Sequence, residues 1–248
     1  RQDGRVAERW LAAPDTIARV LGDLPDAVGA EAEAQWSNLT LAHPPLELGA
    51  RTIRLDQPQV IGILNVTPDS FSDGGQFLDQ PETIAAQGSA MLEAGAAIID
   101  IGGESTRPGA EAVWEGEEIK RVQPAVERMA AMGAAISIDS RRPAVWDMAL
   151  GHGPAIINDV SALRSDPRAA EFVAESGMPV VLMHAPGPAE KLHEGGDYTS
   201  VALDVFDWLR AARDRAVEAG VARSRIILDP GIGLSLIHIS EPTRQAEI

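Results

Sequence analysis

The sequence predicts an α/β fold, a (β/α)8 barrel of the TIM type with about six of its eight β/α units present. The first observation is a repeated alternation from residue 59 onward, in which short apolar runs are followed by polar loops and then by segments of helical periodicity. The second is that nearly every apolar run ends on a polar residue. The third is an aromatic content of only 4%, which leaves aliphatic side chains to fill the core, as in parallel strands buried on both faces.

The apolar runs are of strand length and are separated by stretches that suit helices. The expected strands are 60–64, 96–101, 135–138, 155–157, 179–183 and 225–228. The expected helices are 82–94, 116–132, 143–150, 167–176 and 200–219. In the second of these, Ile119, Val122, Val126 and Met129 follow the spacing of one buried helix face. Repeated units of this kind predict a parallel sheet with right-handed crossovers.

Two architectures fit such units, an open doubly wound sheet and a barrel. The polar residues at the expected strand ends distinguish them: Asn65, Asp100, Asp139, Asn158, His184 and Asp229. In a barrel, all carboxyl ends of the strands converge on one face and build the site. In an open sheet, only the strands at the switch point need polar ends. The pattern therefore favours the barrel.

The chain divides into three expected parts. Residues 1–50 form an N-terminal extension that is partly helical, around 15–21 and 30–35. Residues 51–233 form the incomplete barrel, in which 51–55 is a short strand and hairpin partner that closes the barrel bottom. Residues 234–248 lack strand–helix texture and are expected to be a non-native tail.

Composition excludes several classes of function. The net charge of −16 argues against a nucleic-acid or membrane partner, but leaves room for an anionic substrate held by backbone N–H groups and a metal ion. The absence of cysteine excludes disulfides and thiolate chemistry. There is no apolar run of about 18 residues and no apolar signal core at the N-terminus, so a cytoplasmic protein is expected.

Two polar strings follow the first two expected strands. The string NVTPDSFSDGG, residues 65–75, begins with Asn65, whose amide oxygen suits a hard cation such as Mg²⁺; a polar turn accounts for its composition equally well. The string IDIGGESTRPGA, residues 99–110, contains Arg107, which could hold a phosphate or carboxylate, or pair with a surface carboxylate.

Acidic and amide residues close three later strands. Asp139 lies in ISIDSRRP, Asn158 in IINDVSA and Asp229 in ILDPGIG. Each alone is more often a helix cap or turn residue. Together with the two strings, however, they make the chain resemble the dihydropteroate synthases from about Gln59 to Gly233, and the eleven residues from 65 to 75 match the first signature of that family position by position.

The resemblance implies a transferase of folate biosynthesis. Its substrates are 6-hydroxymethyl-7,8-dihydropterin pyrophosphate and p-aminobenzoate, its products 7,8-dihydropteroate and pyrophosphate, and its cofactor Mg²⁺. No covalent enzyme intermediate is needed; the enzyme places the reactants and stabilises charge.

The resemblance also implies the site residues. The metal ligand is Asn65, and the catalytic residues are Asp139 and Arg107. Asp139, Asn158, Met183 and Asp229 contact the pterin. The remaining substrate contacts come from the loops, with Thr106 toward the pyrophosphate and with Arg107, Pro108 and Phe71 toward p-aminobenzoate.

The sequence departs from the family pattern after DPGIG. Leu234 stands where the family has Phe, and the later Ser-Arg-Lys and Arg-x-His motifs do not occur in the chain. We therefore expect little or no synthase activity from these residues alone, and expect full-length relatives to be homodimers. Two alternatives stay open: a non-catalytic pterin-binding module, and a methyltetrahydrofolate-type methyltransferase domain, which would lack the NVTPDSFSDGG loop.

Overall fold

The computed structural model describes residues 13–39, 41–67, 81–104, 113–188, 196 and 198–232. It divides into two compact units, residues 1–44 and 45–248. In the first, a short 3-10 helix, η1 (Pro14–Thr16), leads into α1 (Ile17–Gly22) and α2 (Asp26–Leu39). Helices therefore occupy much of residues 13–39. None of the residues 13–39 is buried, so these helices have no core of their own among the described residues.

The second unit begins with an antiparallel hairpin, β1 (Leu46–Leu48) and β2 (Arg51–Ile53). The two-residue turn contains Gly49 at φ +61°, the left-handed conformation that such turns require. Leu46, Leu48 and Ile53 are buried against residues at the amino-terminal ends of the next strands, Ile98, Ala135 and Ile156. The hairpin therefore covers the amino-terminal ends of these strands.

Six parallel strands form the main sheet. They are β3 (Ile61–Asn65), β4 (Ile98–Gly102), β5 (Ile136–Asp139), β6 (Ala155–Asp159), β7 (Val180–Met183) and β8 (Ile226–Asp229). Their spatial order is their order in the chain, and every neighbouring pair is parallel. A doubly wound sheet reverses its order at a switch point, whereas a barrel does not. Strand order thus agrees with the predicted barrel class, with six of the units described.

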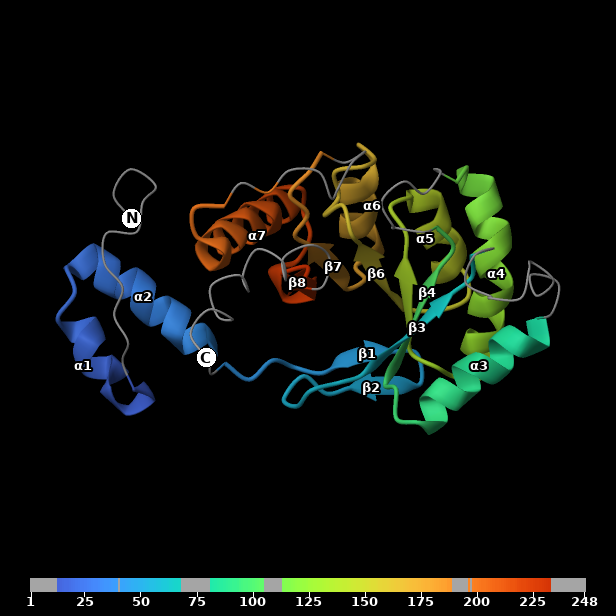
Figure 1. The fold of residues 1–248 in the computed structure, drawn as a ribbon, viewed down its shortest axis with the longest axis horizontal. Helices are drawn as coiled ribbons and strands as arrows, with labels where there is room; N and C mark the ends of the chain where they lie inside the picture. The colour runs from blue at the N-terminus through green and yellow to red at the C-terminus, as the bar shows by residue number, and fades with distance from the viewer. Residues whose placement is uncertain are drawn as a thin grey trace, which may run out of the picture. The chain divides into compact units, whose positions relative to one another are not determined.

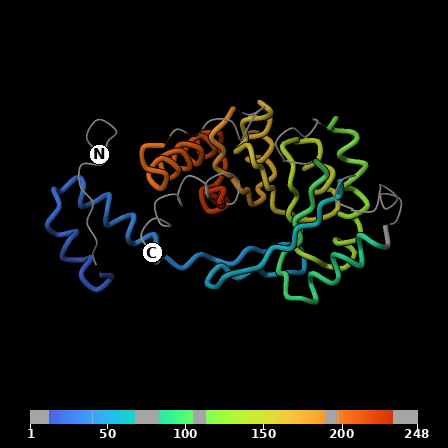
Figure 2. The backbone as a smooth tube through the Cα atoms, in the orientation of Figure 1, coloured from blue at the N-terminus to red at the C-terminus, as the bar shows by residue number. Residues whose placement is uncertain are grey.

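Helices connect the strands and cover one face of the sheet (Figure 1). They are α3 (Pro81–Glu93), α4 (Glu115–Ala131), α5 (Pro143–Leu150), α6 (Ala169–Ser176) and α7 (Val201–Glu218), with a 3-10 turn, η3 (Arg223–Arg225), before β8. The colours in Figure 2 succeed one another across this unit from green to red, so neighbouring β/α units of the chain are neighbours in space. No helix within the described ranges is long and apolar enough to cross a membrane.

The two faces of the sheet carry different side chains, because alternate residues of a strand point to opposite sides. On the helix side lie fully buried residues such as Ile99, Ile101 and Ile138. They pack against the stripe of α4, in which Val122, Val126 and Met129 are buried and Ile119 is partly buried, as predicted.

The inner face lines a cavity of about 340 Å³. Near the hairpin its walls are apolar, whereas Asp100, Ser137, Asn158 and Asp229 line it as well. The polar residues of the strands therefore face the barrel interior.

Two predicted strand ends were wrong by one or two residues. β4 ends at Gly102, one residue beyond the predicted 96–101, and β6 ends at Asp159, two residues beyond the predicted 155–157. The reason is that the register of the ladder, rather than the first polar side chain, decides where a strand ends: Gly102 pairs with both Asn65 and Asp139.

Candidate active site

A row of residues crosses four neighbouring strands near their carboxyl ends. Asn65 of β3 pairs with Gly102 of β4, Gly102 pairs with Asp139 of β5, and Asp139 pairs with Asn158 of β6. The backbone register alone thus brings together three of the predicted site residues. In a barrel, this end of the sheet is where substrates bind.

Gly102 provides the space between the side chains of this row. A methyl group on Gly102 would lie 3.3 Å from Asp139 Oδ2 and 3.6 Å from Asn65 Oδ1. Both side-chain oxygens therefore lie close to the backbone of Gly102. Glycine therefore leaves open a small polar floor between the amide of Asn65 and the carboxylate of Asp139.

Asp100 lies two residues before Gly102 on β4, on the same face of the sheet. The side-chain amide of Asn158 donates to Asp100 Oδ1 at 3.3 Å and to Asp100 Oδ2 at 3.2 Å. Burial raises the pKa of Asp100, while hydrogen bonds from Ser137 and Asn158 act in the opposite direction. Because its nitrogen faces Asp100, Asn158 keeps its amide oxygen as an acceptor for a ligand N–H.

Among these groups, Asp139 is the carboxyl whose pKa is raised most strongly. Burial raises its pKa well above the ordinary value, and the negative charges of Asp100, Glu118, Asp159 and Glu104 raise it further. A carboxylate in such surroundings is stabilised by a ligand that brings paired N–H donors or positive charge. The surroundings of Asp139 therefore suit the donor edge of a flat, nitrogen-rich ring.

Met183 and Asp229 lie on the last two strands and pair with each other. Met183 is buried with Val160 and Ala185. Asp229 lines the cavity, but its Oδ1 accepts a hydrogen bond from the backbone N–H of Gly231 at 2.7 Å. One oxygen of Asp229 thus holds the following turn, which leaves the other for a ligand.

His184 follows Met183, and its ring packs against aromatic side chains. Its ring packs edge-on to Trp208 with centroids 5.1 Å apart, and its Nε2 lies 3.4 Å from the Tyr198 hydroxyl. Burial lowers its pKa, and the charge of Arg164 lowers it further. The ring is therefore neutral at physiological pH.

Four predicted substrate residues lie outside the described part of the chain: Phe71, Thr106, Arg107 and Pro108. The same holds for most of the NVTPDSFSDGG string, of which residues 65–67 are described. The roles of these residues stay predictions.

Three features of the site were not predicted as such. Asp100 was identified only as a strand end, yet it contacts Asn158. Asp159 is fully buried and accepts hydrogen bonds from the backbone N–H groups of Ser161 and Leu163, which holds the turn after Asn158. The repeated pattern of acidic residues at strand ends is the signal that could have identified both.

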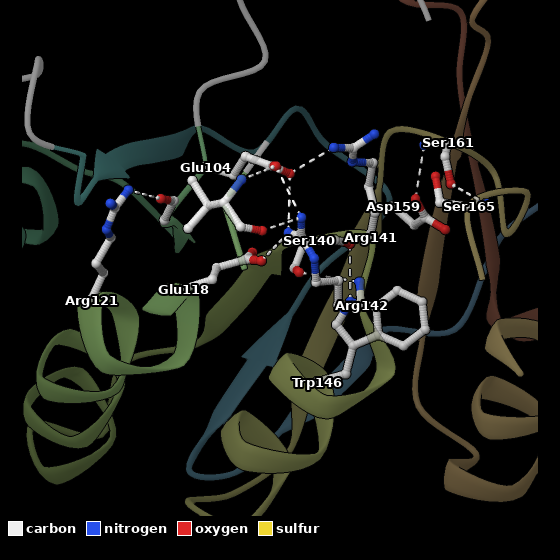
Figure 3. A network of polar contacts seen from close by, with 12 residues as sticks. Glu104, Glu118, Arg121, Ser140, Arg141, Arg142, Trp146, Asp159, Ser161 and Ser165 are labelled. Carbon is white, nitrogen blue, oxygen red and sulfur yellow. Dashed lines mark hydrogen bonds and ion pairs between the residues drawn. The ribbon is translucent and has the colours of Figure 1, made fainter. Parts of the chain in front are cut away.

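The third feature is a network of charged side chains above the strand ends, formed by Glu104, Glu118, Arg141 and Arg142 (Figure 3). The available signal was the pair of adjacent arginines, Arg141 and Arg142, in the string SRRP that follows Asp139.

The described residues contain few possible metal ligands. Among the described residues there is no group of three or more His, Cys, Asp or Glu side chains that could hold an ion. Asn65 is exposed at the end of β3 and offers one neutral oxygen. Mg²⁺ commonly keeps several waters and binds through one or two protein oxygens plus substrate phosphates, so the residues fit an ion brought in with a phosphorylated substrate.

Known proteins resemble this chain over most of its length. A family described as "Pterin binding enzyme" matches residues 61–245. The dihydropteroate synthase of Mycobacterium leprae is 47% identical over 178 residues, which are 71% of this chain and 62% of that protein. The chain thus spans less than two thirds of that relative's length.

Solved structures agree. The dihydropteroate synthase of Xanthomonas albilineans, solved with 4-aminobenzoic acid, has a TM-score of 0.69 and 44% identity, covering 77% of this chain and 67% of that one. The enzyme of Burkholderia cenocepacia, complexed with 7,8-dihydropteroate, has a TM-score of 0.67 and 36% identity, covering 78% and 65%. The family match covers well over half of the sequence, and the chain therefore belongs to the pterin-binding enzyme family.

Proposed function

We propose that this protein is a dihydropteroate synthase and that the described barrel holds the pterin part of its active site. The observation that carries the proposal is the row from Asn65 through Gly102 and Asp139 to Asn158, set above Asp100. The row supplies hydrogen-bond acceptors for a ring that carries several N–H groups. The exposed amide of Asn65 lies at one end of the row. The relatives named above, solved with 4-aminobenzoic acid and with 7,8-dihydropteroate, support the same assignment.

In the proposed reaction, the amine nitrogen of p-aminobenzoate forms a bond to the methylene carbon of the pterin substrate. The carbon–oxygen bond to pyrophosphate breaks, its electron pair leaves with the pyrophosphate oxygen, and the amine loses a proton. Positive charge develops on the pterin as pyrophosphate departs. The protein contributes position and charge stabilisation rather than a nucleophile.

Asp139 serves this reaction electrostatically in the proposal. The surroundings that raise its pKa make its ionised form costly without a ligand. A pterin that donates N–H groups, and then gains positive charge, lowers that cost most in the transition state. The hydrogen bonds from Asn158 to Asp100 orient the Asn158 amide, whose oxygen then accepts a hydrogen bond from the ring. Met183 and the second oxygen of Asp229 complete the pterin contacts.

The loop residues act on the other substrate parts in the proposal. Thr106 contacts the pyrophosphate, and Arg107, Pro108 and Phe71 surround p-aminobenzoate. Asn65 would hold Mg²⁺, and the ion would supply charge neutralisation to the pyrophosphate leaving group. The complete protein is proposed to act as a homodimer, which light scattering tests.

The proposal is tested by binding and by product formation. The chain is titrated with 6-hydroxymethyl-7,8-dihydropterin pyrophosphate, with and without Mg²⁺, and p-aminobenzoate is then added while 7,8-dihydropteroate is followed by mass spectrometry. We expect pterin binding that Mg²⁺ strengthens, and p-aminobenzoate binding that depends on the first ligand. Turnover by these residues alone is expected to be small, because the sequence contains no Ser-Arg-Lys or Arg-x-His motif.

Other outcomes identify the alternatives. A pterin-binding module would bind the pterin and ignore p-aminobenzoate. A methyltransferase domain would bind methyltetrahydrofolate in preference to the pyrophosphate. Absence of pterin binding by the folded chain would overturn the proposal.

A further inference from the structure

Arg164 joins two segments of the chain at the carboxyl end of the sheet. It follows β6, and its Nε donates to the Ser161 carbonyl at 2.9 Å within its own turn. Its terminal nitrogens reach the segment after β7, where Nη1 donates to the Gly187 carbonyl at 3.0 Å and Nη2 to the Ala185 carbonyl at 3.2 Å. The guanidinium also lies over the ring of Trp208 on α7, 5.0 Å from its centroid. One side chain thus connects the segments that follow β6 and β7.

The turn that presents Arg164 has an unfavourable backbone conformation. Ala162 and Leu163, at φ +53° and +61°, are the only non-glycine residues with positive φ among those that the structure describes. Such conformations persist where surrounding contacts fix them, and they are frequent at functional sites. Here the Asp159 carboxylate accepts from the backbone N–H of Ser161 at 2.8 Å (Figure 3) and from that of Leu163 at 2.7 Å. The strained turn places Arg164 directly after it.

The carbonyls that Arg164 binds belong to the surroundings of Met183. Met183 is buried in a small apolar cluster with Val160 and Ala185. Arg164 binds the carbonyl of Ala185 itself and the carbonyl of Ser161, which directly follows Val160 in the chain. Its hydrogen bonds therefore hold both sides of this cluster, one side contributed by the end of β6 and the other by the end of β7.

The chain after Met183 is fixed on its other side by the end of β8. The backbone N–H of His184 donates to the Asp229 carbonyl at 2.8 Å. A methyl group on Gly231 would lie 2.7 Å from the His184 carbonyl oxygen, so the two backbones are in close contact. The contact with β8 is thus made by the backbone, whereas the contact with the turn after β6 depends on the side chain of Arg164.

We propose that Arg164 is a positioning residue that fixes Met183 relative to Asn158, and that it thereby sets the affinity of the site for the pterin. The inference rests on the proposed function, in which Met183 and Asn158 contact the pterin. Arg164 is not itself a pterin contact; it acts through the carbonyls of Ser161 and Ala185. Without these hydrogen bonds Met183 would occupy several positions, and the ligand would have to order it on binding, which lowers affinity.

Arg164→Lys and Arg164→Met separate charge from geometry. Lysine keeps the positive charge, but its single ammonium lacks the planar fork that reaches carbonyls on both segments. Methionine removes the charge as well. Arg164→Lys remains the test if Arg164→Met fails to fold, because lysine retains the charge and the aliphatic stem. Arg168→Lys and Arg168→Met are matched controls, because Arg168 lies in the same β/α unit and pairs with Asp166 on the surface with 67% of its side chain exposed.

Two measurements report on the outcome. Calorimetric titration with 6-hydroxymethyl-7,8-dihydropterin pyrophosphate should show about tenfold weaker binding by both Arg164 variants. In the ligand-free chain, NMR of methyl-labelled methionine should show that the Met183 methyl resonance shifts and broadens in the same variants. The resonance of Met129, which is fully buried in α4, should stay unchanged. The Arg168 variants should change none of these quantities.

Unchanged pterin affinity in Arg164→Lys would overturn the inference, as would an unchanged Met183 resonance. Equal changes at Met183 and Met129 would mean a general loosening of the core and would overturn it as well. If the unaltered chain binds no pterin, the proposed function fails by itself. The Met183 resonance then still decides whether Arg164 fixes this side chain: a selective change supports it, and no change refutes it.

Discussion

The side-chain amide of Asn158 donates to both carboxylate oxygens of Asp100, at 3.3 and 3.2 Å. The two residues lie on β6 and β4, with β5 between them. The contact links the two interior strands on either side of Asp139. It fixes the orientation of Asn158 before any ligand arrives, which reduces the cost of ordering the site on binding.

Replacing Asn158 should therefore weaken pterin binding strongly. We expect Asn158→Ala to lose about 10- to 100-fold in affinity for the pterin, because a ligand contact is lost and Asp100 is left with one donor fewer. Asn38→Ala, at an exposed position of α2, is the control and should bind normally. Isothermal titration of both variants checks this, and equal affinities would contradict it.

Asp139→Asn should stabilise the ligand-free protein at neutral pH. The pKa of Asp139 is raised in the folded state, so its contribution to stability is fully present below the unfolded pKa of about 3.9 and is lost as pH rises through the folded pKa. The variant should therefore melt at a higher temperature at pH 7.5, by about 2–4 °C per kcal/mol gained, and show little gain near pH 3, where Asp139 is protonated. Thermal unfolding across this range measures it.

The exposed Asp147 of α5 gives the matched substitution for that experiment. Asp147→Asn is the exposed control, and its melting temperature at pH 7.5 should match that of the unaltered chain. A lower melting temperature for Asp139→Asn at pH 7.5 would mean that the raised pKa is not the dominant effect.

Gly102→Ala should separate stability from binding. Alanine costs less backbone entropy than glycine, so stability should be kept or rise slightly. The new methyl group, however, would approach Asp139 Oδ2 at 3.3 Å and fill the floor beside Asn65. We expect pterin affinity to fall about tenfold with no loss in melting temperature. A variant that binds normally would show that this space is not used.

Trp146→Phe should test the packing beneath the site. The indole is fully buried and donates to the Ser140 carbonyl at 3.0 Å. Losing this bond and part of the ring should cost about 1–3 kcal/mol in the free energy of unfolding. Trp114→Phe is the control, since Trp114 is 71% exposed. Urea denaturation of both variants makes the comparison, and similar midpoints would contradict the expectation.

Much of the fold could be predicted because its pattern is local. The alternation of apolar runs and amphipathic stretches identified all six described strands of the main sheet, and the stripe of α4 was found from spacing alone. Strand ends were less certain, as Gly102 illustrates. A glycine carries no polarity signal, so only the ladder with Asn65 and Asp139 reveals that β4 extends to it.

The site was predictable where each residue closes its own strand and unpredictable where it depends on distant contacts. Asp139 and Asn158 were found at their strand ends. Arg142, in contrast, is 38 positions from Glu104 and 29 from Val113. The local sequence does not indicate that these residues are in contact, because the contact forms only after the fold has positioned helix α4 and strand β5. The same holds for the contact between Asp100 and Asn158, which are 58 positions apart.

Asp139 is the carboxylate on which pterin binding is proposed to depend most. Asp139→Asn and Asp147→Asn carry the same substitution in one β/α unit, with one at the site and one exposed on α5. Both are titrated with 6-hydroxymethyl-7,8-dihydropterin pyrophosphate by calorimetry at pH 7.5. We expect Asp147→Asn to bind like the unaltered chain and Asp139→Asn to bind at least tenfold more weakly while melting no lower. Equal binding by the two variants would contradict the central claim.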